Sequence, residues 1–195
     1  VLFHRVANTL NYLDIKTVVV SCGTCYDQLA DYQFDKIFPG CRIVDIHEFL
    51  LEKGLKLDGV AGQQYLYHDP CHTPIKTTQP IKVVNELMGQ NVPLSDRCCG
   101  ESGTFATARP DIATQVKFRK QEELEKNKAA LPAGEPVKIL TSCPACLQGL
   151  SRYQDDTGIS ADYIVIEMAK HLLGSQWQDD FVAKAANGGI ERVLL

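Results

Sequence analysis

Five cysteines in the second half of the chain form three motifs that could hold a metal centre. Cys71 stands alone, Cys98 and Cys99 are adjacent, and Cys143 and Cys146 form a C-x-x-C motif. Thiolates bind zinc and iron–sulfur clusters, each of which usually takes four such ligands. Five cysteines exceed that number, so either one is spare or the centre is unusual. The adjacent pair favours a polynuclear centre, because each thiol of the pair can then bind a different metal ion.

Each motif follows a segment with the pattern of a β-strand. The predicted strands are Gln64–Asp69, Val92–Arg97 and Lys138–Ser142. The carboxyl ends of parallel strands lie along one edge of a sheet, so we expect the five thiols to meet there. Neighbouring strand residues point to opposite faces, and the backbone must therefore turn at the double cysteine. Gly100 and Gly103 allow such a turn.

The C-x-x-C motif is expected where a strand leads into a helix. Pro144 directly follows Cys143, and proline is preferred at the first position of a helix. The free N–H groups and the positive dipole end of that helix lower the pKa of a thiol. A second C-x-x-C, Cys22 to Cys25, has the same setting in the first half of the chain.

The remaining pattern predicts an α/β fold with largely parallel sheets. Further strands are expected at Lys16–Ser21, Cys41–Ile46 and Asp162–Ile166, and helices at Tyr26–Tyr32, His47–Lys53, Gln79–Met88, Thr104–Asn127, Leu147–Tyr153 and Glu167–Leu173. The long polar helix among these is expected on the outside of the molecule.

An internal repeat divides the chain into two similar halves. The stretch VVVSCGTCYDQL (Val18–Leu29) corresponds to KILTSCPACLQGL (Lys138–Leu150), and both cysteines are offset by 121 residues. We expect residues 1–62 to be the C-terminal part of a first unit and residues 63–195 a complete second unit, each with a small parallel sheet flanked by helices. The N-terminus reads as the middle of a helix, which predicts a fragment of a longer protein.

Composition excludes several classes of function. The chain has 195 residues and a net charge of −4, which argues against a nucleic-acid surface. No apolar run approaches the roughly 20 residues of a transmembrane helix, and no signal-peptide pattern is present. We expect a cytoplasmic protein that reaches the inner membrane face only through partners. In that compartment, eight cysteines indicate metal binding rather than disulfides.

The order of the motifs resembles that of the cysteine-rich CCG domain. The matching stretches are HDPCH (His68–His72), CCGESGTF (Cys98–Phe105) and TSCPACLQGL (Thr141–Leu150). This domain, usually present twice, occurs in one subunit of heterodisulfide reductase and in the iron–sulfur subunits of glycolate and lactate oxidation systems. The gap from Cys99 to Cys143 is longer than the family's usual pattern, and the extra length falls in the long polar helix and the loop that follows it.

The resemblance implies an iron–sulfur electron-transfer module of a larger oxidoreductase that acts on 2-hydroxy acids or disulfides. It implies a [4Fe-4S] cluster, of the non-cubane type in the heterodisulfide reductase branch, bound by Cys71, Cys98, Cys99, Cys143 and Cys146. Electrons would pass to or from a flavin or ferredoxin-like domain of the parent protein, which would carry any FAD. Cys22 and Cys25 would belong to a first, incomplete site, and the chain alone would have no turnover.

The residue pattern alone is compatible with two other functions. Zinc in four of the five positions would make a structural interaction module without a redox role. A dithiol–disulfide enzyme could use Cys143 and Cys146, but it would not need three further cysteines at neighbouring strand ends.

Three polar residues beside the cysteines have two interpretations each. His68 and His72 either hydrogen-bond the turn at Asp69 and Pro70, or donate a hydrogen bond to a sulfur. Arg97 either offsets the charge of the thiolates or is an ordinary surface residue.

Overall fold

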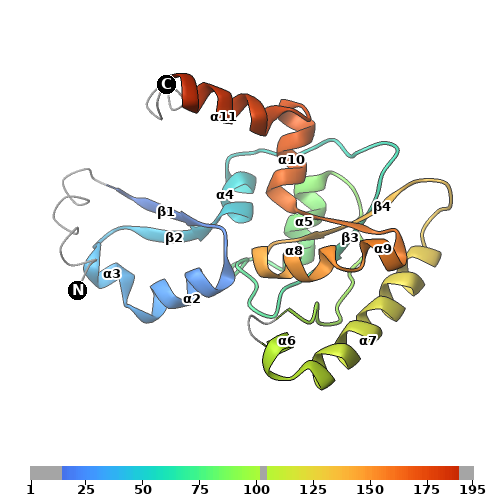
Figure 1. Ribbon diagram of the computed structural model, residues 1–195. Helices are drawn as coiled ribbons and strands as arrows, with labels where there is room; N and C mark the ends of the chain where they lie inside the picture. The colour runs from blue at the N-terminus through green and yellow to red at the C-terminus, as the bar shows by residue number, and fades with distance from the viewer. Residues whose placement is uncertain (1–14, 102–104, 189–195) are drawn as a thin grey trace.

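The computed structural model describes residues 15–101 and 105–188 as a mixed α/β structure with two parallel sheets (Figure 1). This confirms the predicted fold class. The first half contains β1 (Thr17–Val20), α2 (Gly23–Asp31), α3 (Phe34–Ile37), β2 (Arg42–Asp45) and α4 (Ile46–Glu52). The second half contains β3 (Gln64–His68), α5 (Pro80–Met88), α6 (Phe105–Ala108), α7 (Pro110–Ala129), β4 (Val137–Thr141), α8 (Pro144–Ser151), α9 (Gln154–Thr157), β5 (Ser160–Tyr163), α10 (Ile164–Leu173) and α11 (Trp177–Gly188). The helix expected at the N-terminus lies outside the described residues.

The larger sheet has the order β3-β4-β5, with both pairs of strands parallel. The last residue of β3, His68, pairs with Thr141, the last residue of β4, and Thr141 pairs with Tyr163 at the end of β5. All three strands therefore end at the same edge of the sheet. This edge carries the segments in which the cysteine motifs lie.

Helices cover both faces of the larger sheet. On one face, side chains of β3 and β4 pack with α5 and α10 in a core that includes Tyr65, Tyr67, Val83, Val84, Leu87, Met88, Leu140, Ile164 and Met168. On the other face, α7 and α8 cover a core that includes Leu66, Leu124, Val137, Ile139, Leu150, Cys99 and Cys146. Side chains alternate along a strand, so His68 lies on the same face as Leu66. His68 thus faces the layer that contains Cys99 and Cys146.

The smaller sheet repeats part of the larger one. In both halves a strand, a C-x-x-C helix, a short helix, a second parallel strand and another helix follow in that order. Cys22 precedes α2 with φ −149° and ψ 130°, and Cys143 precedes α8 with φ −132° and ψ 125°. The repeat in the sequence therefore reflects a repeated local structure. Cys41 is buried beside Phe34 and Phe38 in the core of the first half.

The predicted strand Val92–Arg97 is wrong as a continuous strand. Only Leu94 forms a bridge, with Tyr67, although Tyr67 N donates to Pro93 O and Ser95 N donates to Tyr67 O (2.8 and 2.7 Å). Pro93 has no N–H group and cannot extend the ladder. The segment still runs beside β3 and brings Cys98 and Cys99 to the shared edge.

Two predicted boundaries are also wrong. The strand expected at Asp162–Ile166 ends at Tyr163, because Ile164 and Met168 lie four residues apart on the buried face of α10. The long helix expected at Thr104–Asn127 is two helices, since Pro110 begins α7 after the short α6. Thr104 lies outside the described residues. The helices α3, α9 and α11 had no counterpart in the sequence prediction.

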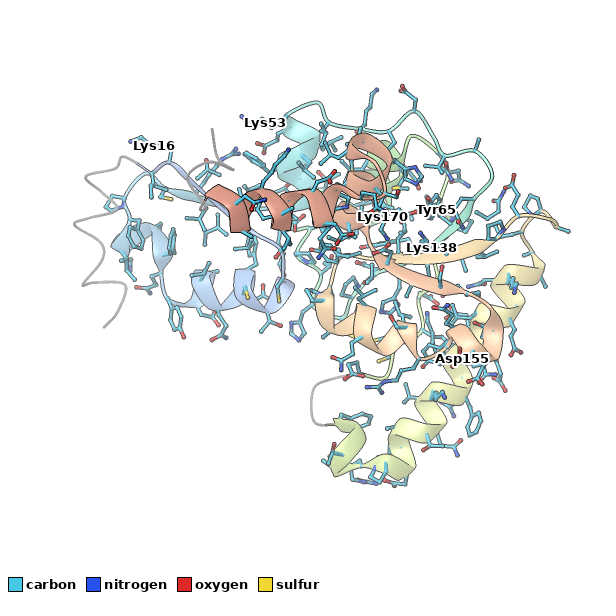
Figure 2. All side chains as sticks on the ribbon, turned by 45° about the horizontal axis from the view of Figure 1, so that its top comes forward. Lys16, Lys53, Tyr65, Lys138, Asp155 and Lys170 are labelled. Atoms are coloured by element: carbon cyan, nitrogen blue, oxygen red, sulfur yellow. The ribbon has the colours of Figure 1, made fainter. Side chains whose placement is uncertain are left out.

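An ionic cluster attaches α10 to the sheet (Figure 2). The hydroxyl of Tyr65 and the ammonium of Lys138 each donate to the Glu167 carboxylate at 2.6 Å, and Lys170 pairs with Asp162. Burial alone would raise the pKa of Glu167, but the hydrogen bonds from Lys138 and Tyr65 lower it to about 2. The carboxylate is therefore charged at neutral pH and remains bound to its donors.

A buried carboxylate of the first half holds a loop of the second half. Glu48 of α4 accepts hydrogen bonds from the backbone N–H groups of Lys76, Thr77 and Thr78 at 3.2, 3.0 and 2.9 Å. The Thr77 hydroxyl donates to the same carboxylate. These residues belong to the loop that begins with Cys71, so the first half supports that side of the edge.

Replacing Glu48 with alanine should lower the free energy of unfolding by about 3 kcal/mol, because three backbone N–H groups and the Thr77 hydroxyl lose a charged, buried acceptor. Urea unfolding monitored by circular dichroism would measure the loss. Glu52→Ala on the same helix removes only an exposed pair with Arg42 and should cost clearly less than Glu48→Ala. Equal losses for the two variants would contradict the role given to Glu48.

Candidate metal centre

Two buried thiols lie at the centre of the candidate site. The Sγ atoms of Cys99 and Cys146 are 3.4 Å apart, and both side chains are more than nine-tenths buried. A ring nitrogen of His68 completes the group, and the three ligand atoms all lie within 4.8 Å of one another. Among the described residues, no other three His, Cys, Asp or Glu side chains meet in this way.

Two glycines allow the backbone to bring these sulfurs together. Gly100 has φ +80°, the conformation expected for the turn after the double cysteine. A Cβ atom at Gly149 would lie 2.9 Å from the Cβ of Glu101 and 3.3 Å from the Cys99 carbonyl oxygen. Only glycine therefore lets α8 approach the Cys99 turn this closely. Gly103, the other glycine expected in the turn, lies outside the described residues.

Hydrogen bonds and nearby charges link the remaining thiols of the second half to this pair. Hydrogen bonding to Cys99 and burial raise the pKa of Cys98, and the nearby charge of Cys71 raises it further. Hydrogen bonds with Cys146 and Cys98 lower the pKa of Cys99, and hydrogen bonds with Cys143 and Cys99 raise that of Cys146. The five cysteines lie in segments that follow the strand ends of one edge, and Cys71 and Cys98 are exposed there.

The helix N-terminus at α8 favours a thiolate at Cys143. The hydrogen bond with Cys146 and the backbone N–H groups of Cys146 and Ala145 lower the pKa of Cys143 to about 6, against the effect of burial. The thiol is therefore ionised at neutral pH, as a metal ligand must be.

Residues of α7 hold the segment that leads to the double cysteine. The buried ammonium of Lys120 donates to Ser95 Oγ, Ser95 O and Glu123 Oε2 at 2.8, 3.2 and 2.8 Å. The carboxylate of Glu123 also accepts from the backbone N–H of Asp96 at 3.0 Å. The sequence placed this polar helix on the outside, and nothing in its pattern distinguished Lys120 from the exposed lysines around it.

His68 is a fully buried polar residue of the site. Its Nδ1 lies 3.3 Å from the carbonyl oxygen of Ser95. Its Nε2 is buried and has no hydrogen-bond partner. The nearby His68 side chain also contributes to the lowered pKa of Cys99.

The other two polar residues singled out by the sequence contact neighbouring helices. His72 is exposed, and its Nδ1 lies 3.4 Å from the Asp27 carboxylate on α2. Arg97 is exposed and donates to the carbonyl oxygen of Arg119 on α7 at 2.7 Å. The contact of His72 is thus neither with the turn at Asp69 and Pro70 nor with a sulfur, the two partners that the sequence suggested.

The first C-x-x-C lies against the loop of Cys71. A Cβ atom at Gly23 would overlap the carbonyl oxygen of His72. Burial and the charges of Asp45, Cys143 and Cys22 raise the pKa of Tyr163. One cysteine of each C-x-x-C motif therefore lies near the same tyrosine hydroxyl. Cys22 is half-buried and Cys25 is exposed, and a hydrogen bond with Cys22 raises the pKa of Cys25.

The donor set fits a soft metal centre. Thiolate and imidazole suit zinc or iron in sulfur coordination, whereas magnesium and calcium require oxygen ligands. None of the eight cysteines, all of which lie in the described segments, is in a disulfide. The buried Nε2 of His68 also has no hydrogen-bond partner. A metal ion bound beside the Cys99 and Cys146 sulfurs would give it one.

Comparison with known families supports this interpretation. The cysteine-rich domain family named CCG matches residues 65–151, which include all five thiols. A second family, a domain of unknown function called DUF3400, matches residues 151–195. No solved structure matches the chain.

The curated relatives of this chain are named as iron–sulfur proteins or as subunits of oxidoreductases. An uncharacterized iron–sulfur protein of Methanococcus maripaludis is 25% identical over 83% of this chain and 33% of its own length. One subunit of the fumarate reductase (CoM/CoB) of Methanothermobacter marburgensis is 25% identical over 84% of this chain and 33% of its own length. The glycolate oxidase iron–sulfur subunit of Escherichia coli is 33% identical over 53% of this chain and 25% of its own length.

The chain spans about a third of the length of the first two of these relatives. In the described part of the chain, no helix has both the length and the apolar character that crossing a membrane requires.

Alkylation of the metal-free, reduced protein should distinguish Cys143 from Cys25. Because the pKa of Cys143 is about 6, its rate of reaction with iodoacetamide should be half-maximal near pH 6 and level above pH 7. The rate at Cys25, whose pKa is raised, should continue to increase through pH 9. Peptide mass mapping after timed quenching would measure both profiles, and coincident profiles would contradict the assignment.

Proposed function

We propose that this chain is the iron–sulfur-binding electron-transfer module of a larger oxidoreductase. In this proposal Cys71, Cys98, Cys99, Cys143 and Cys146 bind a cluster of the [4Fe-4S] type at the carboxyl edge of the larger sheet. The observation that carries the proposal is the 3.4 Å contact between the buried Cys99 and Cys146 sulfurs. The strand pairing supports the wider ligand set, because the segments of the other three thiols follow strand ends at the same edge.

When bound, an iron–sulfur cluster accepts and donates one electron at a time. The chain's own residues would hold and shield it. The N-terminus of α8 stabilises the negative charge at Cys143, and the core on the α7 and α8 face excludes water from Cys99 and Cys146. The exposed Cys71 and Cys98 mark the side that a partner or substrate would approach.

The electron partner would be a flavin or ferredoxin-like domain of the same parent chain or complex, and any FAD would belong to that partner. This part of the proposal is supported by the relatives named as subunits of fumarate reductase (CoM/CoB) and glycolate oxidase. The parent would act on 2-hydroxy acids or disulfides in the cytoplasm. Residues 1–62 would belong to a first unit, with Cys22 and Cys25 in a first site, and residues 63–195 would form the second unit.

Zinc remains the second candidate, because one observation favours it. His68, Cys99 and Cys146 form a compact group to which Cys143 could add a fourth ligand, and four ligands are enough for a structural zinc ion. The protein would then be an interaction module without a redox role.

Protein purified without oxygen should contain iron and acid-labile sulfide and should absorb broadly in the visible range. Replacing the central sulfur in Cys99→Ser should abolish most of this absorption and of the bound iron. Cys41→Ser, which alters a buried thiol in the core of the first half, should retain both. Metal analysis, sulfide determination and visible spectra would measure the three proteins.

Stoichiometric zinc without visible absorption in the wild-type protein would overturn the iron–sulfur proposal in favour of the zinc module. A metal-free protein with thiol–disulfide activity that survives Cys98→Ser would indicate the dithiol enzyme instead. Equal iron in Cys99→Ser and the wild type would exclude Cys99 from the ligand set.

A further inference from the structure

We propose that His68 is a direct ligand of the centre, with its Nε2 bonded to a metal ion next to Cys99 and Cys146. This inference rests on the proposed function, because it concerns the same site. It changes the centre from one bound only by thiolates to one bound by thiolates and an imidazole.

The position of His68 in the sheet directs its side chain into the site. As the last residue of β3 it pairs with Thr141, the last residue before the segment that leads to Cys143. Alternation along β3 places it on the face of Leu66, where Cys99 and Cys146 belong to the same core. The side chain is only 1% exposed, so the ring has no access to bulk water.

The hydrogen bond at Nδ1 determines which ring nitrogen carries a proton. The partner of Nδ1 is the Ser95 carbonyl oxygen, which can only accept, so Nδ1 carries the hydrogen. In the neutral ring Nε2 then has a free lone pair. Histidines that bind metal ions usually donate their other N–H group to a carboxylate or a backbone carbonyl in this way.

A hydrogen bond between Nε2 and the Cys99 sulfur is the competing arrangement. It would leave His68 without a bond to metal, and the strength of the nitrogen coupling in the experiment below separates the two.

The unpaired Nε2 has the distances that a shared metal ion needs. It is buried without a hydrogen-bond partner. A ring nitrogen of His68 lies within 4.8 Å of the Cys99 and Cys146 sulfurs. A metal ion with bonds of about 2.3 Å to sulfur and about 2.0 Å to nitrogen holds its donors roughly 3.5–4 Å apart. Small side-chain rotations would bring the three atoms into that range.

Pulsed electron paramagnetic resonance on the paramagnetic centre tests the assignment directly. The anaerobically purified protein would be labelled with ¹⁵N-histidine, and we expect a strong hyperfine coupling from one metal-bound nitrogen. His68→Gln should abolish this coupling, whereas His72→Gln should leave it unchanged, because the exposed His72 faces Asp27. The reduction potential gives a second readout. His68→Cys should lower it, since a charged thiolate replaces a neutral imidazole.

Each outcome separates the inference from the proposed function. A wild-type centre with iron and sulfide but only the weak coupling of a hydrogen-bonded nitrogen would overturn the ligand assignment and leave the iron–sulfur proposal standing. A strong coupling that persists in His68→Gln would also overturn it. If the wild-type protein binds no iron, the function fails, and nuclear magnetic resonance of the ¹¹³Cd-loaded, ¹⁵N-histidine protein decides the ligand question through the presence or absence of a cadmium–nitrogen coupling. If His68→Gln does not fold, the spectrum of the wild-type protein decides alone.

Discussion

In the parallel pairing of β3 with β4, His68 lies opposite Thr141, and both strands leave the sheet at one edge. The chain that follows β3 contains Cys71 and the chain that follows β4 contains Cys143 and Cys146, so this pairing brings together thiols that are far apart in the sequence. The segment before the double cysteine adds its two hydrogen bonds to Tyr67 and ends at the same edge. A slip of this register by one residue would turn His68 toward α5 and α10, away from the sulfurs.

The packing around this edge places ionisable groups close together at a cost that a metal ion would offset. Two buried sulfurs in contact cannot both be charged, and hydrogen bonding therefore lowers the pKa of Cys99 while it raises that of Cys146. A positive ion between them would allow both to ionise, and its binding energy would then contribute to folding. The first half of the chain supports the same edge from outside, through Glu48 and through the close approach of Gly23 to His72.

The sequence was sufficient to predict β3 and β4, because short apolar or aromatic runs and the cysteines that follow them are local signals. It was not sufficient where tertiary contacts decide. Pro93 leaves the segment before Cys98 with a single bridge, and burial of Ile164 and Met168 moves the end of β5. The sequence singled out His68 as a hydrogen-bond donor to the turn or to a sulfur, and not as a metal ligand. Its free Nε2 depends on the carbonyl of Ser95, 27 residues away, and no local pattern reports such a contact.

An anaerobic crystal structure, with diffraction data on both sides of the iron absorption edge, tests the central claim most directly. The account predicts anomalous iron peaks within bonding distance of the Cys99 and Cys146 sulfurs, at the edge where β3 and β4 end. Iron peaks elsewhere in the molecule, or a metal-free edge with Cys71 and Cys98 turned away from Cys143 and Cys146 in protein that retains stoichiometric iron, would contradict it.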